Sequence, residues 1–442
     1  MNGERRDGLL FLLLGCIVFL FLGVALESVA PGPMSDFKAI DYAARSLMQH
    51  RDPYQKGEIL RLYEQDGGKF PTDPDISRSV HRAVLVCINL PTTLFLMVPF
   101  ALLAWGPAHV LWMALIAASM IFAACLIWDL GANFGPVLSG ALICLILANS
   151  EVLLIIGNVA GIAISLCLVA VWCFMKDRFA LAGVSCLAIS LLLKPHDAGL
   201  VWLYFLLAGG VHRRRALQTL LLVLVVAVPC FFWVSHIAPN WMQELHSNLA
   251  EASARGDLND PGPTSISAHA LGMMVSLQTI LSVFKDDLRF YNPVTYLICA
   301  PLLLAWAWAA LRTRATVERT WLALAAIAAL SMIVVYHRQY DCKLLLLTIP
   351  ACAMLWAKGG ITAWLAVGLN VAAFAFTGDI TWAFVLQLIS RLHISTTGSS
   401  GKLLQAVQAS PNPLILLAMG VFYLWVYMRK PTPTASEEQP AV

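Results

Sequence analysis

Charged residues are scarce in this chain of 442 residues. They make up 12% of it, whereas ordinary soluble domains contain about 25%. The formal net charge is only +3, and no stripe of basic and aromatic residues exists, which excludes a typical nucleic-acid-binding protein. None of the eleven cysteines forms a Cys-x-x-Cys pair, and the histidines and acids of the polar segment 236–292 (His236, His246 and His269 with Glu244 and Asp257) match no known metal-site spacing. We therefore expect neither a disulfide framework nor a bound metal.

Hydrophobic residues, by contrast, make up 59% of the chain. They form runs long enough to cross a bilayer, which takes about 20 residues as a helix. Inside lipid only helices and closed barrels satisfy the backbone, and these runs lack the alternation of a barrel strand. The sequence predicts an all-α, polytopic transmembrane protein with about 11–13 spans in one domain over residues 1–430, then a disordered cytoplasmic tail over 431–442. The clearest runs are 9–26, 83–104, 110–128, 216–234, 293–311, 321–336, 344–356, 361–377 and 413–428, with several more between 136 and 210.

Basic residues cluster in short connectors, and the positive-inside rule places such clusters in the cytoplasm. The longest polar segments, 31–82 and 236–292, then face outward as the first and second outer loops, and 379–412 forms a third. With Trp128 outside and Lys176 inside, the intervening chain has to cross the membrane an odd number of times, once or three times. The clusters are Arg5–Arg6, Lys176 with Arg178, Arg213–Arg215, Arg312 with Arg314 and Arg319, and Arg429–Lys430.

The first outer loop carries far more charge than a connector needs, with eight acids and eight bases between Pro31 and Arg82. Apolar residues at 37, 40, 43, 44 and 47 have helical spacing, which predicts an amphipathic helix over 35–47 at the membrane surface, with Ser35 as its N-cap. A second short helix is expected over 58–64.

The segment from Asp36 to Gln55 contains the pattern DFxxxDYAARSLxxxRDPYQ, where x stands for any residue. A second span with prolines at 91 and 99, the sequence Gly157-Asn158-Val159 and the pair Lys194-Pro195 accompany it. Together these motifs, spread over about residues 9 to 357, resemble glycosyltransferase family 87. Members of that family are multi-span, polyprenyl-phosphate-mannose-dependent transferases of the GT-C fold. They often have Gly-Gln-x-Asn where this chain has Gly157-Asn158.

The resemblance implies a membrane-embedded hexosyltransferase. It would move mannose, with inversion at the anomeric carbon, from a polyprenyl-phosphate donor to a glycolipid or glycan acceptor. The lipid-linked sugar is a co-substrate, and no other cofactor is expected. The implied location is the cytoplasmic (inner) membrane of a bacterium, with the active site facing outward.

Asp36 is the expected catalytic base, because the family's acid in the first outer loop has this role and Asp36 is the matching position. Sugar transfer needs a group that takes the proton of the acceptor hydroxyl. The alternative is an acid that merely favours the helix N-terminus. Asp41 is the second choice, although it points about 140° away on an ideal helix. Tyr42, Arg45 and Asn158 are expected to line the pocket.

Two further polar clusters are expected to hold the donor phosphate. His337 and Arg338, followed by the pocket candidates Tyr340 and Asp341, lie between two apolar runs at the outer surface. Arginine binds phosphate through two parallel contacts. Lys194 and His196 form the other cluster. The alternatives are an interfacial belt for the first cluster and a snorkelling lysine for the second.

Two other classes of function remain open on the sequence. A secondary transporter or lipid flippase would place its polar residues or helix breaks at mid-span and show related halves. The charges of this chain gather at one face instead, which favours an enzyme working at the membrane surface. A GT-C-like protein that only binds its ligand is the other alternative.

Overall fold

The computed structural model describes residues 3–265, 274–391 and 411–429, and within these ranges every regular element is a helix, with no strand. The all-α prediction is confirmed. Eight helical stretches are long and apolar enough to cross a membrane, and four further apolar helices have 10–17 residues. The long stretches are α1 (Gly3–Val29), α6 (Trp105–Gly131), α7 (Pro136–Ala148) with α8 (Val152–Ile156), α12 (Gly210–Ile237), α15 (Leu288–Arg312), α16 (Val317–Val334), the 3-10 helix η2 (Gln339–Leu347) with α17 (Thr348–Lys358), and α21 (Pro411–Met428).

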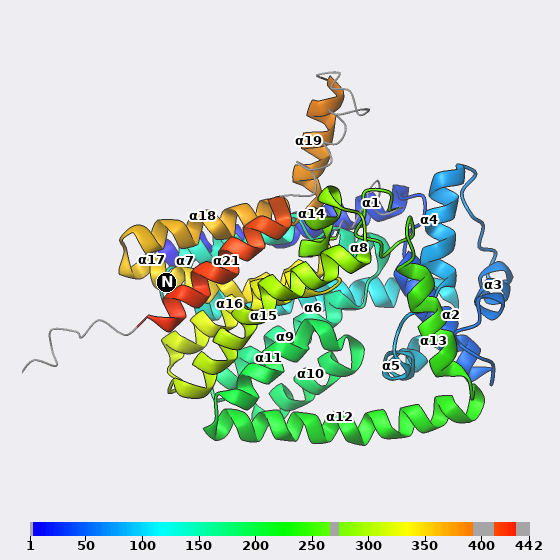
Figure 1. Ribbon diagram of the computed structural model, residues 1–442, viewed down its shortest axis with the longest axis horizontal. Helices are drawn as coiled ribbons and strands as arrows, with labels where there is room; N and C mark the ends of the chain where they lie inside the picture. The colour runs from blue at the N-terminus through cyan, green and yellow to red at the C-terminus, as the bar shows by residue number, and fades with distance from the viewer. Residues whose placement is uncertain (1–2, 266–273, 392–410, 430–442) are drawn as a thin grey trace, which may run out of the picture.

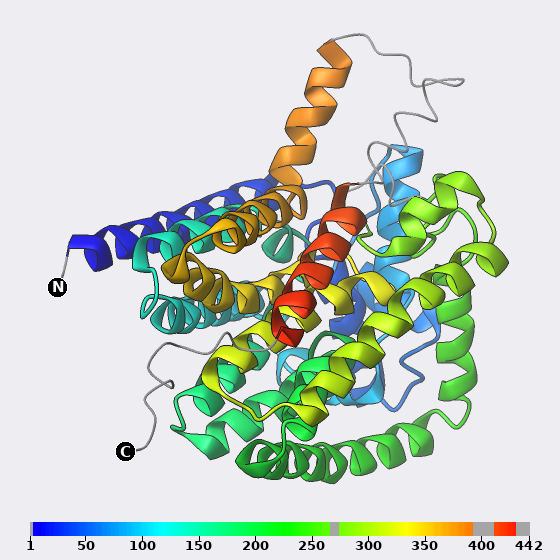
Figure 2. The ribbon, with the colours of Figure 1, turned by 60° about the vertical axis from the view of Figure 1, so that its left-hand side comes forward.

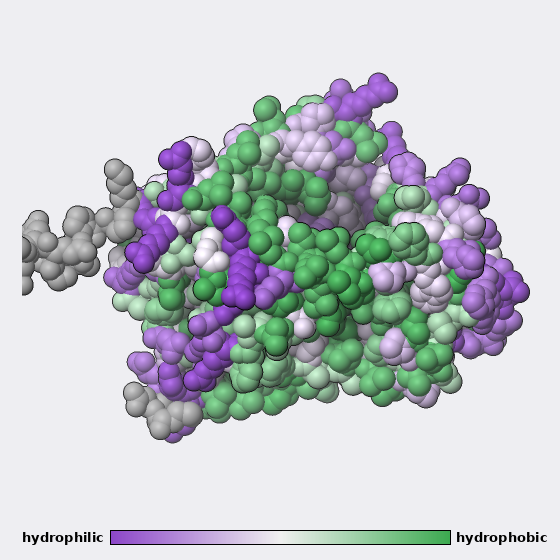
Figure 3. Space-filling model, turned by 90° about the horizontal axis from the view of Figure 1, so that it is seen from below, coloured by the Kyte–Doolittle hydropathy of each residue, from purple (hydrophilic) through white to green (hydrophobic). Residues whose placement is uncertain are grey.

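The long helices run along one axis of the molecule and give it two distinct ends (Figure 1). One end, called the Arg5 end, brings basic connectors together: Arg5 contacts Asn133 at 3.4 Å, and Lys176 pairs with Asp129 at 2.9 Å. The opposite end, called the Asp36 end, carries the two long polar segments. Apolar side chains cover the middle of one face and hydrophilic ones gather toward its two ends (Figure 3), as expected for a protein embedded in lipid.

Four shorter apolar helices and the remaining elements complete the bundle and its Asp36 end. Helix α19 projects away from the other helices in both ribbon views (Figures 1 and 2). The tail over 431–442 and much of the segment 379–412 lie outside the described residues. The remaining elements are α2 (Ser35–Met48), α3 (Lys56–Gln65), α4 (Pro74–Leu85), α5 (Pro91–Ala101), α9 (Ala160–Met175), α10 (Ala180–Leu193), α11 (Pro195–Leu207), α13 (Trp241–Ala252), α14 (Leu277–Phe284), α18 (Ile361–Phe376) and α19 (Asp379–Arg391).

The expected span over 83–104 does not form. Helix α4 ends at Leu85, and α5, which follows an extended segment, has 11 residues, too few for a crossing of about 20. Both ends of α5 lie at the Asp36 end, because Thr92 donates to the Leu192 carbonyl at 2.7 Å and Arg45 to the Leu103 carbonyl at 3.1 Å. The non-helical segment 86–90 divides an apolar run that composition alone presents as continuous.

The expected odd number of crossings between Trp128 and Lys176 is therefore wrong. Because α5 does not cross, α6 starts at the Asp36 end and finishes at the Arg5 end. Lys176 pairs there with Asp129, one residue after Trp128. Two crossings separate Trp128 from Lys176: α7 with α8 runs from the Arg5 end to the Asp36 end, and α9 runs back to the Arg5 end.

Helices α1 and α7 approach closely because glycines face each other across them. A methyl group added at Gly8 would collide with the Pro136 carbonyl, and one added at Gly15 would lie 2.6 Å from the Cys144 Cα. Small residues let transmembrane helices pack backbone to backbone, which gains van der Waals contact where lipid offers no hydrophobic driving force.

Helix α2 fills the centre of the Asp36 end. The predicted helix forms, but its N-cap is Met34 in a left-handed conformation, with φ 55°, so Ser35 is the first helical residue and not the cap. The Met34 N–H donates to the Ile155 carbonyl at 2.7 Å instead. Phe37, Ala43 and Leu47 are fully buried as the apolar spacing predicts, and Asp41 is buried as well. The helix is therefore packed on several sides, with α3, α4 and α5 around it.

Candidate functional site

The carboxylate of Asp36 is held by Asn158 from the turn between α8 and α9. Asn158 Nδ2 donates to Asp36 Oδ2 at 2.5 Å, and Asn158 Oδ1 accepts from the Ala160 N–H at 2.8 Å. The second bond fixes the orientation of the amide, so its NH2 group faces the carboxylate. Gly157 makes the turn possible: its φ is +66°, and a Cβ there would lie 2.8 Å from that of Phe37.

Cationic groups from two other segments act on Asp36. Burial raises the pKa of Asp36, while the Asn158 hydrogen bond and the charges of Arg338 and Lys194 oppose that rise. The side chain is partly exposed, so a ligand can reach it. The result is a carboxylate that holds a proton more readily than usual, beside two cations that it does not contact directly.

Lys194 reaches the site because the chain is not helical at this residue, between α10 and α11. Its φ of −153° is extended, as favoured for a residue that precedes proline. The ammonium pairs with Asp341, lies 3.5 Å from Asp197 Oδ2 and sits 4.8 Å from the centre of the Tyr340 ring. Two carboxylates and an aromatic face thus hold a buried lysine in place.

Arg338 is fixed by both its own connector and the second outer loop. Its Nε donates to the Tyr336 hydroxyl at 2.5 Å, and Nη2 donates to the Leu258 carbonyl at 2.8 Å and to Asn259 Oδ1 at 3.2 Å. The Asp341 carboxylate accepts from the Arg338 backbone N–H at 2.9 Å. The guanidinium is therefore positioned before any ligand arrives.

His196, Asp197 and His337 form a compact group next to Lys194. The His337 Nε2 lies 3.6 Å from Asp197 Oδ1, and the His196 Nε2 lies 3.8 Å from the same oxygen. Asp197 and His337 are buried, whereas His196 is exposed. Three clusters that are up to 300 residues apart in the sequence thus meet at the Asp36 end.

Three other candidates lie elsewhere, on the opposite side of α2. The Arg45 Nε pairs with Asp41 at 2.9 Å, and its Nη1 pairs with Asp66 at 2.7 Å. Tyr42 packs against Trp105, with ring centres 5.9 Å apart. Burial raises the pKa of Asp41 to about 7 against the opposing charge of Arg45. These side chains hold α2 to the rest of the first outer loop. Tyr42 and Arg45 therefore lie away from Asp36, although the sequence predicts them in the same pocket.

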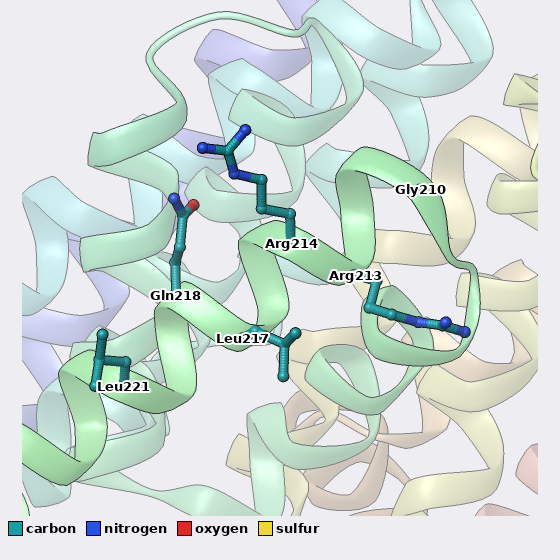
Figure 4. A pocket seen from close by; sticks show the side chains of 6 residues that line it. All are labelled: Gly210, Arg213, Arg214, Leu217, Gln218 and Leu221. Carbon is teal, nitrogen blue, oxygen red and sulfur yellow. The ribbon is translucent and has the colours of Figure 1, made fainter.

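Sequence reasoning missed Tyr336, Asp197 as a partner of His337, and Asn259. Tyr336 directly precedes His337, so its position was an available signal, whereas nothing in the sequence distinguishes Asn259 from other loop residues. A separate shallow pocket on α12 contains none of the candidate residues and lies at the Arg5 end (Figure 4). It is lined by Gly210, Arg213, Arg214, Leu217, Gln218 and Leu221.

Comparison with known proteins identifies the family. No curated protein and no solved structure is found to match the chain. The sequence profile of glycosyltransferase family 87 matches residues 88–336, which is more than half of the chain. The match includes Asn158, Lys194 and Asp197 but begins after the first outer loop and ends just before His337. The chain belongs to glycosyltransferase family 87 and is a membrane-embedded glycosyltransferase.

Proposed function

We propose that the enzyme transfers a hexose, mannose in the first instance, from a polyprenyl-phosphate donor to a glycolipid or glycan acceptor. One observation carries the proposal: among the described residues, the partly exposed carboxylate of Asp36 has a neutral amide as its only direct partner, and the cations Lys194 and Arg338 lie near it. A base beside positive charge is the arrangement that displacement of an anionic phosphate requires.

In the proposed reaction, the acceptor hydroxyl oxygen attacks the anomeric carbon of the donor sugar. Asp36 takes the hydroxyl proton as the new C–O bond forms. The bond from the anomeric carbon to the phosphate oxygen breaks, and its electron pair leaves with the polyprenyl phosphate. Arg338 and Lys194 stabilise the charge that develops on the phosphate. Direct displacement inverts the anomeric configuration, as the family resemblance implies.

The second outer loop is proposed to help position the donor through Arg338. Its residues Leu258 and Asn259 accept hydrogen bonds from Arg338, so a movement of the loop would move the guanidinium. Lys56 and Arg82 of the first outer loop pair with Glu251 of α13. These ion pairs therefore tie the two outer loops together.

A transfer assay with purified protein in lipid tests the proposal. Polyprenyl-phosphate mannose, polyprenyl-phosphate glucose and a nucleotide-linked mannose are offered separately, each radiolabelled, with a membrane extract as acceptor. We expect label to move from the polyprenyl-phosphate mannose. Transfer from the nucleotide sugar alone would reject a lipid-phosphate donor, and preferential transfer of glucose would reject mannose.

The Asp36 end is proposed to face outward from a bacterial inner membrane, because the basic connectors gather at the opposite end. In a variant without native cysteines, a cysteine replacing the exposed Glu64 should react with an impermeant reagent in whole cells. A cysteine replacing the exposed Arg214 should react only after the cells are opened. The reverse pattern would invert the proposed orientation.

A further inference from the structure

We propose that His196, Asp197 and His337 form a binding site for a divalent transition-metal ion, with Zn²⁺ the best match, beside Lys194 at the Asp36 end. This inference concerns a ligand set that the proposed transfer does not use. It contradicts the expectation from sequence spacing that the chain holds no metal. The site itself rests on geometry and stands whether or not the proposed donor is correct.

The spacing of the three candidate ligand atoms fits a small metal ion. Asp197 Oδ1 lies 3.6 Å from His337 Nε2 and 3.8 Å from His196 Nε2, and all three atoms lie within 4.8 Å of one another. Zinc bonds of about 2.0–2.2 Å at tetrahedral angles place ligand atoms about 3.3–3.5 Å apart. Small side-chain rotations close the difference. His196 is free to make the largest one because its side chain is 38% exposed.

The hydrogen bonding of His337 leaves its other nitrogen ready to bind an ion. Its Nδ1 lies 3.2 Å from the Val335 carbonyl, and a carbonyl only accepts, so Nδ1 carries the hydrogen. Nε2 then presents a lone pair toward Asp197 Oδ1. Metal-binding histidines usually have this arrangement, in which the second ring nitrogen donates to a carbonyl or carboxylate and fixes the tautomer.

Two buried acceptor atoms therefore face each other at 3.6 Å. Neither Asp197 Oδ1 nor His337 Nε2 makes a hydrogen bond within the described part of the chain, and the side chains are 0% and 1% exposed. Lys194 lies beside the other carboxylate oxygen, Oδ2, at 3.5 Å. Buried polar atoms are nearly always paired, and a cation between Oδ1 and Nε2 would pair both.

The charge of the site favours the same conclusion. Lys194 faces the carboxylates of both Asp197 and Asp341, so two carboxylates share this one ammonium group. Because neutral histidines add no charge, a bound divalent ion would add positive charge beside Lys194, which suits an anionic ligand. This last step, and only this one, rests on the proposed function.

The ligand types select the class of ion. Two imidazoles and a carboxylate suit Zn²⁺ and related first-row ions, whereas Mg²⁺ and Ca²⁺ prefer oxygen ligands alone. Three protein ligands leave a fourth position for water or for an oxygen of an anionic ligand.

Binding of Co²⁺, a visible probe for zinc sites, tests the inference. The full-length protein in detergent is freed of metal with a chelator and titrated with Co²⁺, and Zn²⁺ is then added as competitor. We expect d–d absorption bands of a tetrahedral site, no sulfur-to-cobalt charge-transfer band from cysteine, and loss of the signal on addition of Zn²⁺. His337→Gln and Asp197→Asn should weaken binding at least about ten-fold. The matched control His246→Gln, an exposed histidine of α13, should not change it.

Each outcome decides the question. His196→Gln separates loss of a metal ligand from misfolding, because this side chain is exposed and its replacement should not disturb the fold. The variant should elute and melt like the wild type while binding Co²⁺ more weakly. Absence of binding in the wild type, or wild-type affinity in His337→Gln and Asp197→Asn, would overturn the site. Zinc binding without any sugar transfer would keep the site and reject the proposed function. Sugar transfer by a wild-type protein that binds no Co²⁺ or Zn²⁺ would reject the metal site and keep the proposed function.

Discussion

Helix α2 carries two aspartates that differ in their exposure and in the group that each contacts directly. Asp41 is fully buried and contacts the guanidinium of Arg45 at 2.9 Å, so no acceptor hydroxyl can reach it. Asp36 is partly exposed, and its side chain accepts a hydrogen bond from the neutral amide of Asn158 at 2.5 Å. Five residues on one helix therefore separate a structural ion pair from a carboxylate that a ligand can approach.

The comparison shows what a raised pKa does and does not reveal. Burial raises the pKa of both carboxyl groups, so the direction of the shift does not distinguish them. The two carboxyl groups are distinguished by their exposure and by the group that each contacts directly. A catalytic base has to be reached by the group that it deprotonates, and a carboxylate in direct contact with a cation loses basicity.

Replacing the accessible aspartate should have the largest effect on the rate. Asp36→Asn keeps the size and the hydrogen bond while deleting the proton acceptor, so kcat should fall about 10²- to 10⁴-fold. Donor binding and the apparent melting temperature should stay near the wild-type values. Steady-state transfer, donor affinity and thermal unfolding are measured on the same preparation. Turnover close to that of the wild type would show that another residue is the base.

Removing the guanidinium should act on the donor and not on the base. Arg338→Ala deletes a charge-assisted contact worth about 1.5–3 kcal/mol, so donor affinity should fall about 10- to 150-fold. Arg338→Lys should recover part of the loss, because it keeps the charge but not the fork of donors. Binding of radiolabelled donor to protein in lipid measures both. Unchanged affinity in a well-folded Arg338→Ala variant would assign the residue to the interfacial belt.

Replacing the buried aspartate should change stability and leave the rate nearly intact. Asp41→Asn breaks the ion pair with Arg45, which keeps Asp66 at 2.7 Å, so the cost should be about 1–3 kcal/mol. The apparent melting temperature should fall, and kcat should stay within a few-fold of wild type. A large loss of kcat at unchanged stability would reverse the roles of the two aspartates.

Much of this architecture was predictable, because long apolar runs and clustered basic residues are strong local signals. The helix over 35–48 followed from the spacing of Phe37, Ile40 and Leu47, and Asp36 stood out by its position. The run over 83–104 predicts a span that does not form, because composition does not show that the chain leaves the helix over 86–90. That single error reversed the assigned side of Trp128.

The contacts within the site were less predictable, because they join residues far apart in the sequence. Spacing rules for metal sites cannot find His337 as a partner of Asp197, since 140 positions separate them in the chain. Tyr42 and Arg45 are predicted to line the pocket, but the helix turns them away from Asp36, toward Trp105 and Asp66. Only the packing of α2 against α8 places Asn158 on the Asp36 carboxylate.

The smallest expected effect, a shift in pH dependence, tests whether Asn158 tunes the base. The Asn158 amide donates to the charged carboxylate and so lowers the pKa of Asp36, against the rise caused by burial. Transfer requires the unprotonated form, so kcat/KM should fall as the pH drops through the pKa of Asp36. Asn158→Ala removes the donor, raises that pKa further and moves the acidic limb of the profile to higher pH, with activity recovered above it. Asn158→Gln keeps an amide donor and should restore part of the shift, while the exposed Asn240→Ala serves as the matched control. A profile that loses height equally at every pH, without a shift of its acidic limb, would mean that Asn158 only holds the turn in place.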